Sequence, residues 1–444
     1  MSRKSENRKL TLSSCDILYG VREGDGFMNA GVWEKMYQSL QKPRLDPVLT
    51  GFNANIDRVI PVTPDLLRSF EHHAVQGFDA IFDRLKQSMR YCSADEVFIR
   101  EPSLYRELSA SFSRSGTLAV GGQAGIAAVH MRRLGITPVT CAVPAAGPGT
   151  SALLRNAGVN PLTFESGAGD RSDITHLIFE YSPDLVPLAD GVVPRSNRFI
   201  VSPVHDSSTV IIPKEFETSF LEQITSCRRA FLSGYQYLRT EQEFVTASRQ
   251  IRMIRSVHPL MRTHVECVSG AGRNVMTMML RHILPNTDSI GLNERELGLF
   301  MHALRAHDPA STALLPSSPV ATVRDAIALA DATGVSRIHL HTFGYYVLIL
   351  KSETTKPEVS LNALLLAARV TADTAEGDEQ ILSRDGLRAY ASVREVFGPD
   401  ETPGIFRDAE RVVVLIPTYI SQHIHKTTGL GDVLSSTAFV ADRF

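Results

Sequence analysis

Short apolar runs of strand length alternate with segments of helical periodicity along most of this chain. Most of the runs are apolar at every position rather than at every second one, which indicates strands buried on both faces. Such strands, separated by helices, are typical of an α/β fold with a mostly parallel central sheet covered on both sides. The strand-like runs lie at 47–52, 138–143, 230–236, 263–268, 337–341 and 411–416, and helical periodicity is clearest at 30–41, 241–256 and 322–333.

A strand-rich region in the middle of the chain indicates a second, smaller sheet. Residues 175–181 and 197–201 have the composition of strands. Upstream of them, residues 58–115 combine helical segments with a short strand-like stretch at 96–99. We therefore expect these two regions to form a smaller unit beside the main sheet.

Composition and charge exclude several classes of function for this protein. The 444 residues include 46 Lys and Arg and 48 Asp and Glu, and the formal net charge of -2 excludes a strongly basic nucleic-acid-binding protein. No apolar stretch follows the charged residues 1–9 as in a signal peptide, and no run has the length needed to span a membrane. The five cysteines are scattered and form no C-x-x-C pair, which favours a reducing compartment without structural zinc. We expect a cytoplasmic protein without nucleic-acid or membrane partners.

The segment 428–432, T-G-L-G-D, lies between the apolar run 411–416 and small residues that suit a tightly packed helix. Its glycines let the backbone approach a ligand closely, and free N–H groups at the start of a helix bind anions. A phosphate bound there would repel the carboxylate of Asp432. That carboxylate is therefore best explained as a base that takes a proton from a hydroxyl attacking the phosphate. An ordinary N-cap role for Asp432 is the alternative.

Polar residues also follow the first predicted strand. Asn55 and Asp57 alternate to one side and could hydrogen-bond a polyol, although an Asx-rich turn is an equal alternative. A glycine turn at 121–125 leads into a helix of small residues, but its spacing is not G-x-G-x-x-G. This spacing argues against a Rossmann dehydrogenase.

Two further pairs of polar residues suit a divalent cation. His264 and Glu266 share one face of a predicted strand, and Asn293 and Glu296 share the first turn of a predicted helix. Carboxylates of this kind suit Mg²⁺, which keeps several waters and binds one or two carboxylates together with substrate phosphates. A helix-capping pair is the alternative for the second pair, and a buried hydrogen-bonded pair for the first. With the anion site and the candidate base, these residues predict phosphoryl transfer without a P-loop or a protein-kinase motif set.

In these segments the chain resembles the ADP-dependent sugar kinases, that is, the ADP-dependent glucokinases and phosphofructokinases of the ribokinase superfamily. The likeness extends from Trp33 to the C-terminus, and the matching segments occur in the order found in that family. They are 51–57, 121–126, 176–181, 194–200, 232–236, 264–266, 293–296 and 429–432.

The resemblance implies a ribokinase-like α/β fold with two domains. One is a large Rossmann-like domain with a central, mostly parallel sheet, and the other is a smaller α/β lid domain over the sugar site. Residues 1–57, 116–159 and 213–444 would form the large nucleotide-binding domain, and residues 58–115 and 160–212 the lid.

The resemblance also implies roles for single residues. Asp432 would be the catalytic base, and the amides around Gly429 and Gly431 would hold the transferred phosphoryl group. Glu266 and Glu296 would organise Mg²⁺, partly through water. The sugar-contacting positions would be Asn55, Asp57, Gly122, Gln123 and His176, and the nucleotide positions Asn293, His341, Thr342, Gly429, Leu430 and Gly431.

The residues that would select the acceptor sugar favour two different substrates. Glu96 matches an acidic residue that favours unphosphorylated glucose and also occurs in relatives that use both substrates. Arg195 and Arg198 could bind a sugar phosphate, because guanidinium groups bind phosphate with two parallel hydrogen bonds. We expect ADP-dependent conversion of fructose 6-phosphate to fructose 1,6-bisphosphate, with AMP as the by-product and glucose as a second acceptor.

Other functions fit the same residues. They are a dedicated ADP-dependent glucokinase, an ATP-dependent enzyme of the ribokinase type, and a catalytically inactive sugar- or nucleotide-binding regulatory protein. We expect a monomer or a small homo-oligomer.

Overall fold

A computed structural model describes most of the chain after residue 29. The described residues are 30–71, 77–92, 95–164, 173–183, 187–188, 191–193, 195–268, 272–305, 316, 318–352, 356–375, 377, 380–400, 402–421 and 428–444.

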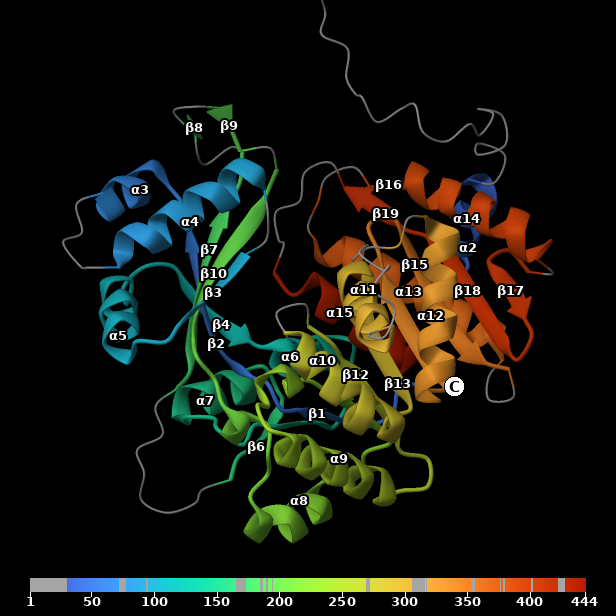
Figure 1. The fold of residues 1–444 in the computed structure, drawn as a ribbon, viewed down its shortest axis with the longest axis horizontal. Helices are drawn as coiled ribbons and strands as arrows, with labels where there is room; N and C mark the ends of the chain where they lie inside the picture. The colour runs from blue at the N-terminus through green and yellow to red at the C-terminus, as the bar shows by residue number, and fades with distance from the viewer. Residues whose placement is uncertain are drawn as a thin grey trace, which may run out of the picture.

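A ten-stranded sheet forms the centre of the larger unit (Figure 1). Seven neighbouring strands run parallel, from β14 to β6, and three antiparallel strands extend one edge. In sheet order the strands are β17 (Ile405–Asp408), β18 (Arg411–Pro417), β15 (Tyr345–Lys351), β14 (Arg337–His341), β13 (Ser289–Asn293), β12 (Arg262–Glu266), β11 (Arg229–Leu232), β1 (Val48–Gly51), β5 (Val139–Ala142) and β6 (Asn160–Leu162).

Helices cover both faces of this sheet, as its uniformly apolar strands predict. Side chains of α6 and α15 pack with Val48, Cys141 and Phe231 on one face, whereas α9, α11 and α12 belong to the core cluster that includes Leu49 and Ala230 on the other. The helices are α2 (Ala30–Gln38), α6 (Gln123–Arg133), α7 (Pro148–Asn156), α8 (Glu217–Gln223), α9 (Glu241–Ser256), α10 (Arg273–Met278), α11 (Glu294–Leu304), α12 (Pro319–Thr333), α13 (Pro357–Thr374), α14 (Arg384–Phe397) and α15 (Leu430–Ala441).

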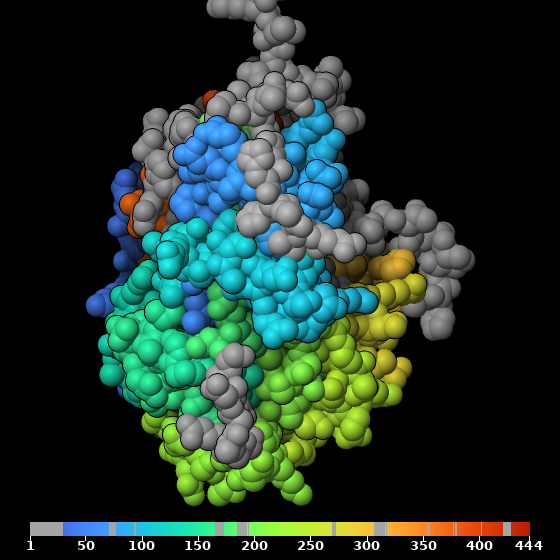
Figure 2. Space-filling view, turned by 90° about the vertical axis from the view of Figure 1, so that its left-hand side faces the viewer, coloured from blue at the N-terminus to red at the C-terminus, as the bar shows by residue number. Residues whose placement is uncertain are grey.

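A five-stranded mixed sheet forms the smaller unit, which lies at the upper left in Figure 1. Its outer side is covered by α3, α4 and α5, which also form much of the surface seen in Figure 2. Phe70, Phe82, Phe112 and Phe179 pack together in its core, where the first two rings stack with centroids 5.1 Å apart. In sheet order the strands are β3 (Asp95–Ile99), β10 (Asn197–Pro203), β7 (Thr175–Tyr181), β2 (Asn55–Pro61) and β4 (Thr117–Gly121), and the helices are α3 (Pro64–Glu71), α4 (Phe78–Tyr91) and α5 (Pro102–Ser111).

Two strands lie on different sheets from those that the predicted domain boundaries imply, and a third, β2, begins within the predicted large domain although it belongs to the small sheet. β4 belongs to the small sheet because it pairs antiparallel with β2, and β6 belongs to the large sheet because it pairs parallel with β5. The division into a nucleotide-binding domain and a lid remains a prediction. Two small two-stranded sheets complete the described strands, formed by β16 (Gln380–Leu382) with β19 (Tyr419–Ser421) and by β8 (Pro187–Leu188) with β9 (Gly191–Val192).

Membrane insertion was not expected from the sequence. In the part of the chain that the structure describes, no helix combines the length and apolarity needed to cross a bilayer.

Candidate active site

The start of α15 has the geometry expected of an anion site. Gly429 is the N-cap with φ of 76°, a left-handed conformation that favours glycine, and Leu430, Gly431 and Asp432 form the first turn. The backbone N–H groups of such a first turn have no acceptor within the helix. Gly431 lies beside the nucleotide candidate His341, because a Cβ added to Gly431 would be 3.7 Å from Nε2 of that histidine.

The residue before this turn connects it to the small sheet. The Thr428 hydroxyl donates a 2.8 Å hydrogen bond to the Glu180 carboxylate on β7. The predicted strand at 411–416 is β18, but β19 follows it before α15 begins. Residues 422–427 lie outside the described part of the chain.

Asp432 has the electrostatics of a carboxylate that can exchange a proton near neutral pH. Its pKa is raised to about 7, mainly by burial and also by the negative charges of Asp57 and Glu296. The Arg198 guanidinium and a hydrogen bond from Gln123 act in the opposite direction. A base is most effective when its pKa lies near the working pH, so these surroundings suit the predicted role.

The predicted sugar-contacting residues Asn55, Asp57 and His176 lie together on β2 and β7. Nδ2 of Asn55 donates to Oδ1 of Asp57 at 2.8 Å, and the same oxygen lies 4.0 Å from Nδ1 of His176. The predicted alternation of Asn55 and Asp57 to one side is confirmed, although both residues belong to a strand of the small sheet rather than to a turn. Burial raises the pKa of Asp57 to about 7, and Asn55 and Arg198 oppose that rise while Glu96 and Glu180 add to it.

Gly122 and Gln123 stand where α6 begins, next to the same residues. Gly122 has φ of 72°, and a Cβ there would lie 2.5 Å from the Asn53 carbonyl oxygen and 2.7 Å from Oδ1 of Asn55. Nε2 of Gln123 donates to the Cys267 carbonyl at 3.3 Å, beyond the end of β12. Gln123 thus connects the sugar-side residues to the edge of the large sheet.

Glu96 and the two arginines lie on or beside the strands of the small sheet. Ser202 on β10 donates to Oε1 of Glu96 at 2.8 Å, while burial raises the pKa of Glu96. Arg198 is partly buried and acts electrostatically on Glu96, Asp57 and Asp432, whereas Arg195 is exposed. The structure therefore brings Arg198 to the carboxylates and leaves Arg195 at the surface.

The predicted pair His264 and Glu266 is a buried hydrogen-bonded unit at the end of β12. Nε2 of His264 lies 3.0 Å from Oε2 of Glu266, and the Ser435 hydroxyl donates to that oxygen at 2.5 Å. On its other side, His264 Nδ1 lies 2.8 Å from the Ser289 hydroxyl, which accepts from Nη1 of Arg337 at 3.0 Å. Because Arg337 can only donate, Ser289 donates to Nδ1, and His264 donates from Nε2 to Glu266.

Asn293 and Glu296 form the helix-capping arrangement that was the alternative for this pair. The Asn293 side chain accepts from the Glu296 N–H at 3.0 Å, and both carboxylate oxygens of Glu296 accept from Asn293, at 2.8 and 3.1 Å. This capping box fixes the start of α11. It holds the Glu296 carboxylate close enough to raise the pKa of Asp432 and of Glu266.

The carboxylates of Glu266 and Glu296 suit a divalent cation that is bound partly through water, rather than one enclosed by protein ligands alone. No cluster of three His, Cys, Asp or Glu ligands occurs among the described residues. Glu266 uses only Oε2 for its hydrogen bonds to described residues, so Oε1 remains available. Burial and the charges of Asp432 and Glu296 raise the pKa of Glu266, and a cation would relieve this repulsion. Mg²⁺ normally keeps several waters, so one or two carboxylates suffice.

The two residues predicted at the nucleotide lie at the end of β14 and in the turn after it. His341 is partly buried, and burial lowers its pKa to about 4, so the imidazole is neutral at physiological pH. The Thr342 hydroxyl donates to the Tyr345 carbonyl at 2.6 Å within the turn to β15. Thr342 thus has a structural role in this conformation.

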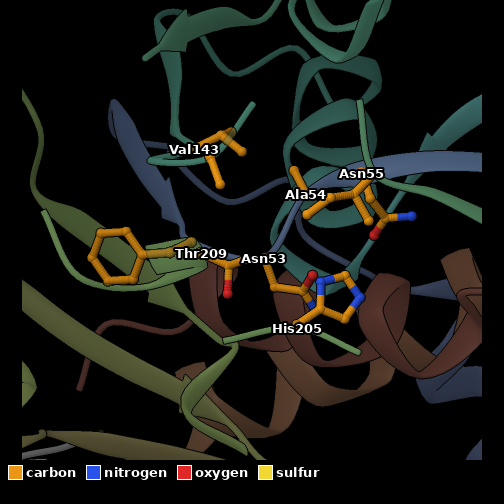
Figure 3. Close-up of a pocket in the computed structure, with 9 residues that line it drawn as sticks. Asn53, Ala54, Asn55, Val143, His205 and Thr209 are labelled. Atoms are coloured by element: carbon orange, nitrogen blue, oxygen red, sulfur yellow. The ribbon is translucent and has the colours of Figure 1, made fainter. Parts of the chain in front are cut away.

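A hollow opens at the carboxyl end of β1, beside Asn55 (Figure 3). Its volume is about 10 Å³, which is room for about one water molecule or one hydroxyl group. Its walls are Phe52, Asn53, Ala54, Asn55, Val143, Ala145, Ile174, His205 and Thr209.

Four residues of the site were not predicted from the sequence. Ser435 lies one helical turn after Asp432, a spacing that could have revealed it. Gly291 faces Glu266, and Glu180 and His205 come from the small sheet and the segment after it. No local pattern marks these last three, because their partners are distant in sequence.

Comparison with known proteins gives one consistent family. The conserved region described as ADP-specific Phosphofructokinase/Glucokinase matches residues 46–441. The ADP-dependent glucose/glucosamine kinase of Pyrococcus furiosus is 27% identical over 92% of this chain and 98% of its own length. The ADP-specific phosphofructokinase of Methanosarcina acetivorans is 25% identical over 90% and 93% of the two chains.

Solved structures agree on the fold. An ADP-dependent kinase in complex with fructose-6-phosphate and ADPβS superimposes with a TM-score of 0.75 at 22% identity, covering 94% of this chain and 97% of the other. A phosphofructokinase from Pyrococcus horikoshii OT3 with AMP gives a TM-score of 0.69 at 20% identity, with 90% and 98% coverage. The predicted α/β fold with a large, mostly parallel sheet is confirmed. With the family region spanning nearly the whole chain, this protein belongs to the family of ADP-dependent phosphofructokinases and glucokinases, which are phosphotransferases.

Proposed function

We propose that this protein transfers the terminal phosphoryl group of ADP to a hexose, with fructose 6-phosphate as its main acceptor, glucose as a second acceptor and AMP as the by-product. The observation that carries the proposal is the position of Asp432 in the first turn of α15, beside the amides of the anion site. Its pKa is raised to about 7, and the charges of Asp57 and Arg198, which belong to the small sheet, influence that pKa.

In the proposed reaction, the carboxylate of Asp432 takes the proton of the acceptor hydroxyl. The oxygen forms a bond to the terminal phosphorus of ADP as the bond from that phosphorus to the bridging oxygen breaks, and AMP leaves. The amides of Leu430 and Gly431, with the positive end of the α15 dipole, hold the phosphoryl oxygens. Arg198 opposes the negative charge that gathers between Asp432 and the phosphates.

A divalent cation would supply further charge neutralisation at the phosphates. Glu266 and Glu296 are the residues that would hold it, through Oε1 of Glu266 and through water. The His264 and Ser435 hydrogen bonds fix the orientation of the Glu266 carboxylate. Partners of this kind orient metal-binding carboxylates.

A dedicated glucokinase is the second candidate, because Glu96, Asp57 and Glu180 make the sugar side of the site acidic. An acidic wall accepts hydrogen bonds from hydroxyls and repels a phosphate. Arg198 and the exposed Arg195 are the groups that would offset this repulsion for fructose 6-phosphate.

The test is a matrix of ADP or ATP against glucose or fructose 6-phosphate, with identification of the nucleotide product. The proposal predicts AMP formation from ADP with fructose 6-phosphate, and slower formation with glucose. Turnover with glucose alone would establish the second candidate. Turnover with ATP in preference to ADP, or with neither sugar, would refute the proposal.

A further inference from the structure

His205 lies in a position that neither the sequence motifs nor the family likeness assigns. It follows β10 and lines the hollow beside Asn53 and Asn55, and Figure 3 shows its ring next to the Asn53 side chain. Only 4% of the residue is exposed. A buried histidine that faces a hollow needs partners for both ring nitrogens, so its contacts show what is missing.

One ring nitrogen of His205 has a hydrogen-bond partner. Its Nε2 lies 2.8 Å from Nε2 of His176, the predicted sugar-contacting histidine on β7. The two rings also lie edge to face, with centroids 5.0 Å apart, and the Tyr237 ring lies 4.5 Å from that of His205. The imidazole is therefore held in one orientation by contacts on two sides.

The other ring nitrogen, Nδ1, makes no hydrogen bond to any described residue. A second unpaired group lies beside it at the hollow: Oδ1 of Asn55 is buried and has no hydrogen-bond partner among the described residues. Both residues line the same hollow, and neither of these two atoms has a hydrogen-bond partner among the described residues, which indicates that a hydroxyl-bearing ligand or water completes them.

Of the two histidines, His205 carries the proton that is shared between the two Nε2 atoms, for the following reason. Nδ1 of His176 lies 4.0 Å from Oδ1 of Asp57, so an ionised Asp57 favours the His176 tautomer with its proton on Nδ1. His176 then accepts at Nε2, and His205 donates there. This leaves Nδ1 of His205 as a bare acceptor toward the hollow.

We propose that His205 is a further substrate-contacting residue, which accepts a hydrogen bond from a hydroxyl of the acceptor hexose through Nδ1 and is held in that tautomer by His176 and Asp57. The inference rests on the proposed function and extends it. It assigns the hollow to the hydroxyl-bearing part of the sugar rather than to a phosphate, because a bare nitrogen beside Oδ1 of Asn55 offers no donor to an anion.

The test compares His205→Phe with His205→Gln at pH 8, where Asp57 is ionised. Phenylalanine keeps the ring contacts and removes the acceptor, while glutamine restores an acceptor oxygen. The readouts are KM and kcat for the acceptor hexose, and the thermal stabilisation of the protein by that hexose without nucleotide. His130→Phe is the matched control, because His130 is a similarly buried histidine that bonds Thr437 between α6 and α15, outside the hollow.

We expect His205→Phe to raise KM about threefold to tenfold, as for the loss of one neutral hydrogen bond, with little change in kcat. The glutamine variant should recover part of the loss, and His130→Phe should leave KM unchanged. Deoxy sugars, which each lack one hydroxyl, identify the hydroxyl that His205 would bind. One deoxyhexose should bind the wild-type protein more weakly than the parent sugar, and this difference should disappear in His205→Phe.

Unchanged KM in His205→Phe, or the same deoxy-sugar penalties in the variant and the wild type, would overturn the assignment. If the wild-type protein phosphorylates no hexose and gains no thermal stability from one, the proposed function fails and this inference fails with it. If hexose stabilises the wild type and His205→Phe equally, only the role of His205 is refuted.

Discussion

A methyl group at Gly291 would test how closely the Glu266 carboxylate must be held. A Cβ added to Gly291 on β13 would lie 2.0 Å from Oε2 of Glu266, 2.5 Å from the Ser435 hydroxyl and 2.8 Å from Nε2 of His264. Ordinary contacts begin near 3.4 Å, so in Gly291→Ala the carboxylate must retreat by about 1.4 Å. The Ser435 and His264 hydrogen bonds cannot keep their lengths in that movement.

Two effects follow, and each has a magnitude. Overpacking of a core typically costs about 1–3 kcal/mol of the free energy of unfolding. Misplacing a group that orients a metal ligand typically costs about 10- to 100-fold in metal affinity. We therefore expect Gly291→Ala to lower the unfolding temperature and to raise the Mg²⁺ concentration needed for half-maximal turnover by at least about tenfold.

The assay is a Mg²⁺ titration of ADP-dependent turnover, together with thermal unfolding and direct binding of Mn²⁺. Gly51→Ala is the matched control, because Gly51 also lies on a parallel strand of the large sheet but leaves room for a methyl, with its nearest neighbour at 3.6 Å. A destabilised Gly291→Ala with the metal titration of the wild type would refute the reasoning, since Glu266 would then pack without organising the cation.

Three further predictions concern the carboxylates. The value of kcat/KM should fall as the pH drops below about 7, because Asp432 must be ionised to accept a proton and burial raises its pKa to about 7; a profile that is flat between pH 5 and 8 would contradict this role. Glu296→Gln should raise the Mg²⁺ requirement, whereas Glu294→Gln in the same helical turn should not; equal titrations in both would leave Glu296 with only its capping role. Glu96→Ala should reduce turnover of glucose more than that of fructose 6-phosphate, measured as the ratio of the two kcat/KM values; an equal loss on both sugars would remove Glu96 from substrate selection.

The mostly parallel character of the large sheet could be predicted because its signals are local, whereas its antiparallel edge of β15, β18 and β17 was not predicted. Uniformly apolar runs predict buried parallel strands, and the runs at 263–268 and 337–341 correspond to β12 and β14. The capping pair at Asn293 and Glu296 was likewise recognisable, because a capping box is defined by a spacing of three residues. The candidate base was found through the glycines beside it.

The parts that could not be predicted depend on pairing between distant segments. β4 and β6 are short strands whose sheet is decided by their partners, not by their own composition. His205 meets a histidine 29 residues away, and Thr428 meets Glu180 across 248 residues. The first contact depends on the pairing of β7 with β10, and the second forms only when the small sheet lies against the start of α15; no local periodicity encodes either arrangement.

The most direct test of the account is the turnover of Asp432→Ala with ADP and the preferred hexose, measured as AMP release beside a separate measurement of ADP binding. A general base typically contributes about 10²- to 10⁴-fold to the rate. We predict a loss of kcat of that order while ADP still binds, because the amides at the start of α15 remain in place. A kcat close to that of the wild type would contradict the central claim that this carboxylate takes the proton of the acceptor hydroxyl.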